Sequence, residues 1–325
     1  MAGDPQLDVL AVGNALVDVL ARAGEDVLDA QGLVKGSMQL VDAAESARLY
    51  DAMGPGVEAS GGSAANTAVG VASLGGRSGF VGRVRDDPLG EVFTHAIRAA
   101  GVRFDTPPAT SGEPTGRCLV LVTPDGERTM STFLGAAAEL APSDIDPAVL
   151  GTAGVTFLEG YLWDPPEARA ALVTAAEQAH AAGRRVAFTL SDGFLVDRYR
   201  AEFTPFVSDH VDITFANESE VLSLFETDDF DAAVGRLAAL CDIAAVTRGE
   251  HGSVVAHGDA RHAVAAVPTE VVDTTGAGDL YAAGFLFGLA RGWELDRCAE
   301  VGGIAAAEVI SHIGPRPLVK LADLL

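Results

Sequence analysis

The chain has 325 residues, enough to bury one large α/β core or a core with a smaller appendage. Its 22 Lys and Arg residues stand against 46 Asp and Glu, which gives a formal net charge of −24 at pH 7. Such a charge argues against nucleic acid and anionic membranes as partners. An anionic substrate would have to be held by local features, such as backbone N–H groups, metal ions or one or two arginines.

Cysteine spacing and the N-terminus indicate the compartment. Cys118, Cys241 and Cys298 lie far apart and in no Cys-x-x-Cys spacing, so neither a disulfide framework nor a zinc site is expected. The chain begins Met1-Ala2-Gly3-Asp4-Pro5 without a basic leader region, and no apolar run reaches membrane-spanning length. We therefore expect a soluble cytoplasmic protein.

Short apolar runs alternate with helical segments along most of the chain. A buried strand is expected at 7–12, ending in Gly13-Asn14, and a second at 15–20. Further strands are expected at 80–81, 155–158, 185–188, 211–215, 243–246, 254–255 and 263–264. This rhythm predicts an α/β fold with a doubly wound, mainly parallel sheet, which binds ligands at the carboxyl ends of its strands.

One expected hairpin interrupts this alternation of strands and helices. The runs 117–122 and 128–133 flank Pro124-Asp125-Gly126-Glu127, a composition typical of a tight turn. We expect a small β lid, joined by strands near Asp18 and at 38–40, which closes on substrate. The predicted organisation is a single catalytic domain at 1–325 with a lid subdomain at roughly 15–42 and 108–134.

The segment Asp273-Thr274-Thr275-Gly276-Ala277-Gly278-Asp279 precedes an apolar run that continues to Ala290, so it predicts a glycine turn feeding a buried helix. Helix N-termini present free N–H groups, and glycines let an anion approach them closely. Asp279, in the first turn, would stand where a carboxylate takes a proton from an attacking hydroxyl. The ordinary alternative is a tight turn in which Asp273 or a threonine caps the helix and Asp279 favours its dipole.

Other polar residues fall at informative places. Asp18 lies in an apolar strand, where it either faces water by alternation or accepts hydrogen bonds from a vicinal diol. The small residues of 61–75 predict a helix packed closely on the sheet, which does not by itself require Asn66. Asn217-Glu218-Ser219-Glu220 and Thr247-Arg248-Gly249 each follow an expected strand. Asn217 and Glu220 also have the spacing of a helix capping box.

Three of these segments, in this order, resemble the signatures of the ribokinase-like (PfkB) kinase family over essentially the whole chain. They are Gly61-Gly62-Ser63-Ala64-Ala65-Asn66, Asn217-x-x-Glu220 and Asp273 to Asp279. Within the family the chain is most similar to adenosine kinases, in Gly13-Asn14-Ala15-Leu16-Val17-Asp18, in Ser63 where ribokinases usually carry lysine, and in Arg128-x-Met130-x-x-x-Leu134-x-Ala136-Ala137. The lid lacks the basic cluster with which sugar-phosphate kinases hold the phosphate of the acceptor.

The resemblance implies ATP-dependent phosphorylation of the 5′-hydroxyl of adenosine to AMP. Asp279 would be the general base, and the Gly276, Ala277 and Gly278 amides would form the anion hole. Arg128 would swing onto the phosphates, although a surface arginine is the ordinary interpretation. The ribose would contact Asp18, Gly62, Ser63 and Asn66. Leu16, Leu40, Met130, Leu134 and Tyr161 would form the adenine slot; core packing is the alternative for each.

The resemblance also implies cofactors and partners. The nucleotide would lie near Asn217, Thr247, Gly249 and Thr275, and Mg²⁺ would be held through water by Asn217 and Glu220. Some members of the family carry a monovalent-cation site, K⁺ for example, which Asp273 and Thr275 would form here. The partner would be a small nucleoside or sugar. Because lid strands in the family either close over the site or pair between subunits, both a monomer and a homodimer are compatible with the sequence.

Three rival functions stay open. A kinase for another nucleoside, or for a free sugar such as ribose or fructose, would keep the scaffold and the base and change only the acceptor pocket. A nucleoside-binding protein without turnover would have no need of Asp279 beside an anion hole. A dinucleotide oxidoreductase is disfavoured because the turn Gly13-Asn14-Ala15 lacks Gly-x-Gly-x-x-Gly.

Overall fold

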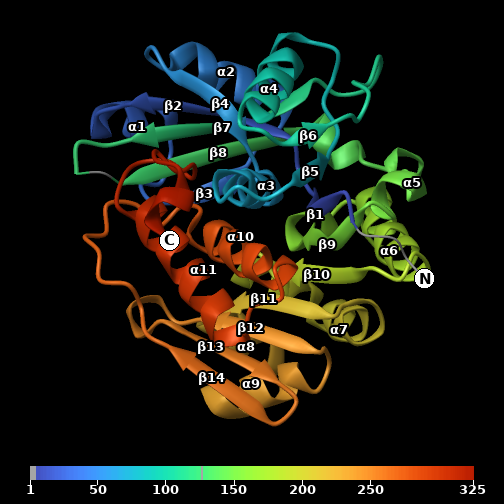
Figure 1. Ribbon diagram of the computed structural model, residues 1–325. Coiled ribbons are helices and arrows are strands. Elements are labelled where there is room, and N and C mark those ends of the chain that lie inside the picture. The colour runs from blue at the N-terminus through green and yellow to red at the C-terminus, as the bar shows by residue number, and fades with distance from the viewer. Residues whose placement is uncertain (1–4, 126) are drawn as a thin grey trace.

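The computed structural model describes residues 5–125 and 127–325 (Figure 1). Gly126, in the predicted hairpin turn, lies outside the described residues. Residues 1–4, which belong to the segment used to predict that no basic leader is present, also lie outside them. Within the described part of the chain, the larger sheet has nine strands. Seven are mutually parallel, in the spatial order β12 (Ile243–Thr247), β11 (Ile213–Asn217), β10 (Arg185–Thr189), β9 (Ala153–Glu159), β1 (Leu7–Val12), β5 (Ser78–Val81) and β6 (Arg103–Phe104). The antiparallel strands β13 (Ser253–His257) and β14 (Ala260–Val264) extend the β12 edge.

Helices cover both faces of this sheet because its central strands are apolar on both sides. In β1, Val9 and Ala11 join one core cluster, whereas Leu10 and Val12 join the other. The first cluster is completed by α3 (Ser63–Ser73), α4 (Pro88–Ala99), α10 (Ala277–Ala290) and α11 (Leu295–Ile310). The second is completed by α5 (Pro147–Leu150), α6 (Pro166–Ala181), α7 (Gly193–His210), α8 (Glu218–Phe225) and α9 (Phe230–Ala238). The predicted doubly wound, mainly parallel α/β fold is confirmed.

A second, five-stranded sheet lies beyond α3 and forms the upper part of the molecule in Figure 1. Its spatial order is β3 (Met38–Leu40), β8 (Arg128–Gly135), β7 (Thr115–Val122), β2 (Leu16–Arg22) and β4 (Val57–Gly61). The strands β7 and β8 form the predicted antiparallel hairpin, and the segments around Asp18 and 38–40 join it as parallel neighbours. The strand β4 lies outside both segments that the sequence predicted for the lid.

The connection between the two sheets places the ligand-binding edge. Only residues 13–15 separate β1 from β2, so the chain leaves the carboxyl edge of the large sheet and enters the second sheet at once. The helices α1 (Glu25–Gln31) and α2 (Ala43–Ala52) lie on the second sheet. Short 3₁₀ turns are η1 (Ala136–Glu139), η2 (Pro142–Asp144), η3 (Gly160–Trp163), η4 (Gly249–His251) and η5 (Leu321–Leu324).

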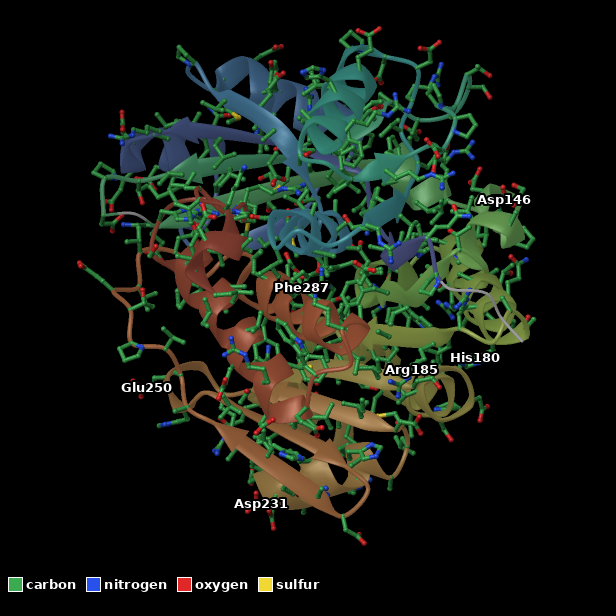
Figure 2. All side chains as sticks on the ribbon, in the orientation of Figure 1. Asp146, His180, Arg185, Asp231, Glu250 and Phe287 are labelled. Atoms are coloured by element: carbon green, nitrogen blue, oxygen red, sulfur yellow. The ribbon has the colours of Figure 1, made fainter. Side chains whose placement is uncertain are left out.

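Several acidic side chains lie at the surface of the molecule. Figure 2 shows Asp146, Asp231 and Glu250 at the periphery of the molecule, where all three are exposed, whereas Phe287 is buried. Among residues 5–125 and 127–325, no helix is long and apolar enough to cross a membrane.

Candidate active site

A cavity of about 430 Å³ lies between the two sheets. Its floor is formed where parallel strands of the large sheet end, at Asn14, Glu159, Thr189, Asn217 and Thr247. This is the edge at which such sheets bind ligands. Its roof is formed by alternate residues of the second sheet, because side chains two apart on a strand share a face. These residues are Leu16, Asp18, Leu20, Met38, Leu40, Cys118, Val120, Arg128, Met130, Thr132 and Leu134.

The residues that the sequence predicted for the site meet at this cavity, with two exceptions. Gly249 begins the turn η4, Asp273 precedes the lining residue Thr274, and neither lines the cavity. The others line it and come from distant parts of the chain: Leu16, Asp18, Leu40, Gly62, Ser63, Asn66, Arg128, Met130, Leu134, Tyr161, Asn217, Glu220, Thr247, Thr275, Gly276, Ala277, Gly278 and Asp279. Their chemical roles remain predictions.

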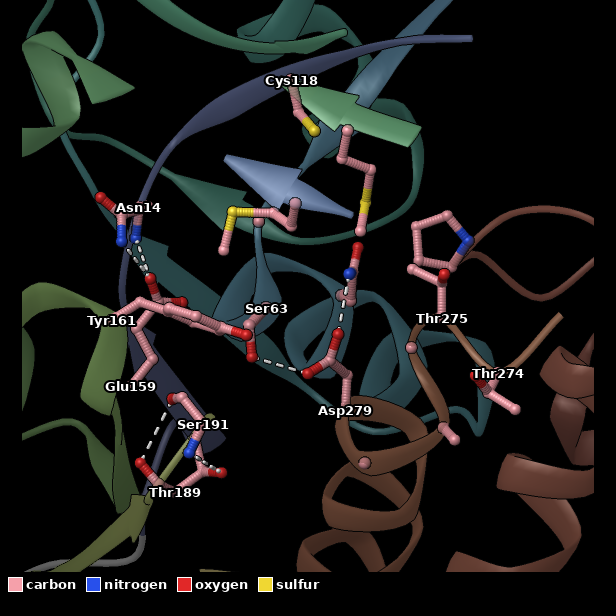
Figure 3. Close-up of a pocket in the computed structure, with 18 of the residues that line it drawn as sticks. Asn14, Ser63, Cys118, Glu159, Tyr161, Thr189, Ser191, Thr274, Thr275 and Asp279 are labelled. Carbon is pink, nitrogen blue, oxygen red and sulfur yellow. Dashed lines mark hydrogen bonds between the residues drawn. The ribbon is translucent and has the colours of Figure 1, made fainter. Parts of the chain in front are cut away.

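Asp279 is held by the first turn of the opposite helix. The Ser63 hydroxyl donates to its Oδ1 at 2.6 Å, and the Asn66 amide donates to its Oδ2 at 2.8 Å (Figure 3). Burial raises the pKa of Asp279, whereas the hydrogen bonds from Ser63 and Asn66 and the charge of Arg316 lower it. The carboxylate is thus oriented before any substrate binds.

Glycine at position 62 makes this arrangement possible. Gly62 is the N-cap of α3 and has a φ of +98°, a conformation that L side chains rarely adopt. A Cβ there would lie 2.1 Å from the Asn14 carbonyl oxygen, so no other residue fits without moving the backbone. The turn brings the start of α3 against the β1–β2 connection and points Ser63 and Asn66 at α10.

The N-terminus of α10 opens into the cavity. Its N-cap, Gly276, is in the left-handed region at a φ of +81°, and no side chain of the described residues caps it. The alternative in which Asp273 or a threonine caps this helix is therefore wrong. A Cβ on Gly278 would meet nothing within 4 Å, which leaves room for an anion above the first turn. The Ala277 N–H donates to the Thr274 carbonyl at 3.2 Å and would have to exchange this bond for a phosphate oxygen.

Asp18 lies on the cavity side of β2 and not on a solvent-facing side. It is half-buried, and the absence of a Cβ on Gly61 makes room for its carboxylate, since a Cβ there would lie 2.3 Å from it. Burial raises the pKa of Asp18 to about 6; Arg316 and Arg128 lower it, and Asp279 raises it. Asp18 and Asp279 are therefore two carboxylates close enough to influence each other.

Arg128 is buried, so its interpretation as a surface arginine is wrong. Its guanidinium makes an ion pair with the Asp273 carboxylate at 2.5 Å and donates to the Thr275 hydroxyl at 2.9 Å. The Asp273 carboxylate also accepts hydrogen bonds from the Thr275 N–H and hydroxyl and from the Gly314 N–H. A monovalent cation does not fit here, because Arg128 already provides the positive charge at Asp273.

Asn217 and Glu220 form the predicted capping box at the start of α8. The Glu220 N–H donates to Asn217 Oδ1 at 2.8 Å, and the Asn217 N–H donates to Glu220 Oε2 at 2.9 Å. Burial raises the pKa of Glu220 to about 7. Among the described residues no group of three or more His, Cys, Asp or Glu side chains could hold a metal. These donors fit a hydrated Mg²⁺, whose waters Glu220 and Asn217 would contact and whose charge would offset that of the phosphates.

The sequence missed two charged residues. Glu159, at the end of β9, lines the cavity with no exposed surface, and its carboxylate accepts the N–H groups of Asn14 and Ala64. Burial raises its pKa to about 7. The sequence signal for Glu159 was an acidic residue directly after an apolar run. Arg316 lies behind the cavity wall, and its only signal was a lone basic residue between Pro315 and Pro317.

The apolar residues proposed for a base line the cavity roof together with side chains that the sequence did not nominate. Leu16, Met130 and Leu134 are joined there by Leu20, Met38, Cys118 and Val120, and Leu40 is 53% exposed at the rim. Tyr161 and Phe194 also line the cavity. The cavity therefore has a largely apolar wall, in which Asp18 and Arg128 are the charged residues, and a polar wall that includes Glu159 and Asp279.

A helix-end anion hole beside an oriented carboxylate, at the carboxyl edge of a doubly wound sheet, is the arrangement of a phosphotransferase. The chain matches the pfkB family carbohydrate kinases over residues 36–320. It is 28% identical to 5-dehydro-2-deoxygluconokinase of Shouchella clausii, over 98% of this chain and 94% of that one. Among solved structures, adenosine kinase from Sinorhizobium meliloti is 55% identical with a TM-score of 0.91, covering 98% of both chains. A probable sugar kinase from Rhizobium etli is 50% identical with a TM-score of 0.92 over 98% of both chains.

The chain therefore belongs to the pfkB family of carbohydrate kinases, as the sequence motifs indicated. It is a kinase that transfers phosphate to a hydroxyl acceptor. The acceptor is a sugar or a nucleoside, and the names of its relatives include both.

Proposed function

We propose that the chain phosphorylates the 5′-hydroxyl of adenosine with ATP, giving AMP and ADP. The observation that carries the proposal is the two-sided cavity. Asp279 lies on its polar wall, whereas Asp18 lies on the apolar wall beside Leu16, on the same face of the second sheet as Val120 and Met130. A free sugar carries hydroxyls around its whole rim and would leave the apolar wall unfilled, whereas a nucleoside presents a diol at one end and a flat base at the other. The identity of 55% to an adenosine kinase supports this choice.

The proposed roles follow from the contacts. Asp18 would accept hydrogen bonds from the two ribose hydroxyls. Asp279, already aligned by Ser63 and Asn66, would take the proton of the 5′-hydroxyl as it attacks. The amides at the start of α10 would stabilise the charge on the transferred group. When bound, ATP supplies the phosphoryl group, and Mg²⁺ neutralises much of the charge of the phosphates.

Kinases for a sugar or for another nucleoside are the competing assignment, since two of the relatives above are named as sugar kinases. They would use the same base and anion hole. A binder without turnover is disfavoured because Asp279 is present, aligned and next to an open helix terminus.

The test is ADP release from Mg-ATP by the purified protein with adenosine, inosine, guanosine, cytidine, ribose, fructose and 5-dehydro-2-deoxygluconate as acceptors. We expect kcat/KM for adenosine to exceed that for each other acceptor. Preferred turnover of a sugar would retain the base and the anion hole and refute the assignment of the apolar wall to adenine. Adenosine binding without turnover of any acceptor would support the binder.

A further inference from the structure

The segment that follows α11 contacts both signature elements of the site. The Gly314 N–H donates to Asp273 Oδ2 at 2.9 Å. Pro315 packs against the turn before α10, since a Cβ on Gly276 would lie 2.9 Å from the Pro315 Cα. The next residue, Arg316, reaches the other signature element. The segment thus connects the anion-hole turn to the start of α3.

Arg316 clamps the turn between β4 and α3. Its Nη2 and Nε donate to the Ser60 carbonyl at 2.8 and 3.2 Å, and its Nη1 donates to the Ala65 carbonyl at 3.0 Å. Ser60 is near the end of β4 and Ala65 is in the first turn of α3, so the guanidinium spans the glycine pair 61–62. Arg316 does not line the cavity. Any effect on the reaction therefore acts through the residues that do.

We propose that Arg316 is a positioning residue of the phosphoryl-transfer site: it holds the turn that aims Ser63 and Asn66 at Asp279, and it provides a positive charge that acts on Asp279 and Asp18. The proposal rests on the proposed function in one respect, because it takes Asp279 as the general base.

The charges around the two carboxylates support this assignment. Burial raises the pKa of Asp279 and of Asp18, and Arg316 opposes the rise in both. Burial lowers the pKa of Arg316 to about 10, against the opposing charges of Asp18 and Asp279, so the guanidinium stays protonated at neutral pH. Among the described residues, Arg316 is the cation whose charge acts on Asp279, and Arg128 is paired with Asp273.

Other titratable groups near the two carboxylates do not provide a second cation for Asp279. The charge of Arg128 acts on Asp18. The remaining groups are neutral or negative near pH 7 and include Glu159 and Tyr161 near Asp279, and Cys118 near Asp18. Removing the Arg316 charge therefore leaves Asp279 with the hydrogen bonds from Ser63 and Asn66 but without a cation that opposes the effect of burial.

Two kinds of substitution separate the effect of the Arg316 hydrogen bonds from the effect of its charge. Arg316→Lys keeps the charge and loses the forked hydrogen bonds, whereas Arg316→Gln removes the charge and keeps a shorter donor. Arg316→Met provides a second neutral variant if Gln does not fold. Arg98→Gln is the matched control, because Arg98 also donates through Nε and Nη2 to one carbonyl, that of Phe104, and does not line this cavity.

The experiment is the pH dependence of kcat/KM from pH 5 to 9, with whichever acceptor in the panel turns over fastest, so that a sugar in place of adenosine leaves the test intact. In Arg316→Gln we expect the acid limb to move to higher pH by about one unit and kcat at pH 7 to fall about tenfold. In Arg316→Lys we expect the acid limb of the pH profile to keep its wild-type position while kcat at pH 7 falls. In Arg98→Gln both the acid limb and kcat at pH 7 match those of the wild type.

An unshifted acid limb in a folded Arg316→Gln or Arg316→Met variant overturns the proposal, because a purely structural clamp lowers the rate without moving the limb. If no acceptor turns over, the proposed function fails separately. The Arg316 proposal is then decided by a ¹³C NMR titration of the Asp279 carboxyl, assigned with Asp279→Asn. A higher pKa in Arg316→Gln than in the wild type supports it, and equal values refute it.

Discussion

Arg128 of the second sheet and Asp273 of the turn before α10 form a buried ion pair of 2.5 Å that joins the cavity roof to this turn. Their side chains are 7% and 5% exposed. The pair is 145 residues apart in sequence (273 − 128) and fixes the hairpin that carries Met130 and Leu134 over the site. The position of β8 and the position of the turn before α10 are therefore linked.

Removing either partner alone should destabilise the fold strongly, because the other charge stays buried without compensation. We expect Arg128→Met and Asp273→Asn each to lower the free energy of unfolding by about 3 kcal/mol, and the double variant to lose less than the sum. Urea unfolding measures all three. The control is the pair Arg103–Asp105, which has the same 2.5 Å separation but side chains that are 45% and 58% exposed. Its variants should cost below about 1 kcal/mol. Strict additivity at Arg128 and Asp273 would contradict the coupling.

The same ion pair predicts independence from monovalent cations. Because the Arg128 guanidinium already neutralises Asp273, replacing K⁺ by tetramethylammonium at constant ionic strength should leave kcat unchanged. A loss of activity that K⁺ restores would show that a cation binds after Arg128 has moved.

Asp279→Asn tests the general base. We expect kcat to fall by roughly 10²–10⁴-fold, because the amide cannot accept the hydroxyl proton, while the affinity for the acceptor changes little. Calorimetric binding and steady-state kinetics separate these two effects. Asp231→Asn, at an exposed position remote from the cavity, is the control. An Asp279→Asn enzyme with normal kcat would remove Asp279 as the base.

Asp18 should account for recognition of the ribose diol. Without its 2′-hydroxyl, 2′-deoxyadenosine should bind more weakly than adenosine by about 1–3 kcal/mol, since a buried carboxylate loses a donor. In Asp18→Ala this difference should largely disappear, because the partner of that hydroxyl is gone. Dissociation constants of both nucleosides for both proteins complete the cycle. A difference that survives in Asp18→Ala would assign the diol to another group.

Glu159 should make the protein more stable as the pH falls from about 8 to 5. Its folded pKa of about 7 exceeds the value of about 4.5 for an unfolded Glu, so between these values the native state binds more protons than the unfolded state. Stability therefore rises as the pH falls through 7 and levels off below about 4.5, and the carboxyl contributes about 1–3 kcal/mol to this change. Asp18 and Glu220 act in the same direction.

The check is the midpoint of thermal unfolding against pH for the wild type and Glu159→Gln, which cannot ionise. The slope between pH 5 and 8 should be shallower in the variant, whatever its absolute stability. Parallel curves would mean that Glu159 does not titrate in this window.

The sequence by itself determined the elements with strong local signals. Apolar runs separated by Ala-rich segments predicted the parallel strands and their helices, because burial on both faces requires side chains without polar groups. The glycines before α3 and α10 predicted close backbone approaches, and both Gly62 and Gly276 have a positive φ. The spacing of Asn217 and Glu220 predicted a capping box that the structure contains. The strand β4 escaped prediction because Val-Glu-Ala-Ser-Gly contains a single β-branched residue.

Only the tertiary structure decided which charges meet. Nothing local to Arg128 distinguishes it from a surface arginine, and its partner Asp273 comes from a different sheet connection. The sequence analysis did not single out Arg316, yet it donates to the Ser60 and Ala65 carbonyls. Ion pairs and long-range hydrogen bonds depend on where the chain brings distant atoms in three dimensions, whereas periodicity and turn chemistry act between near neighbours. For that reason the sequence predicted the glycine turn before α10 and singled out Asp279, whereas the fold revealed the contacts of Arg128 and Arg316.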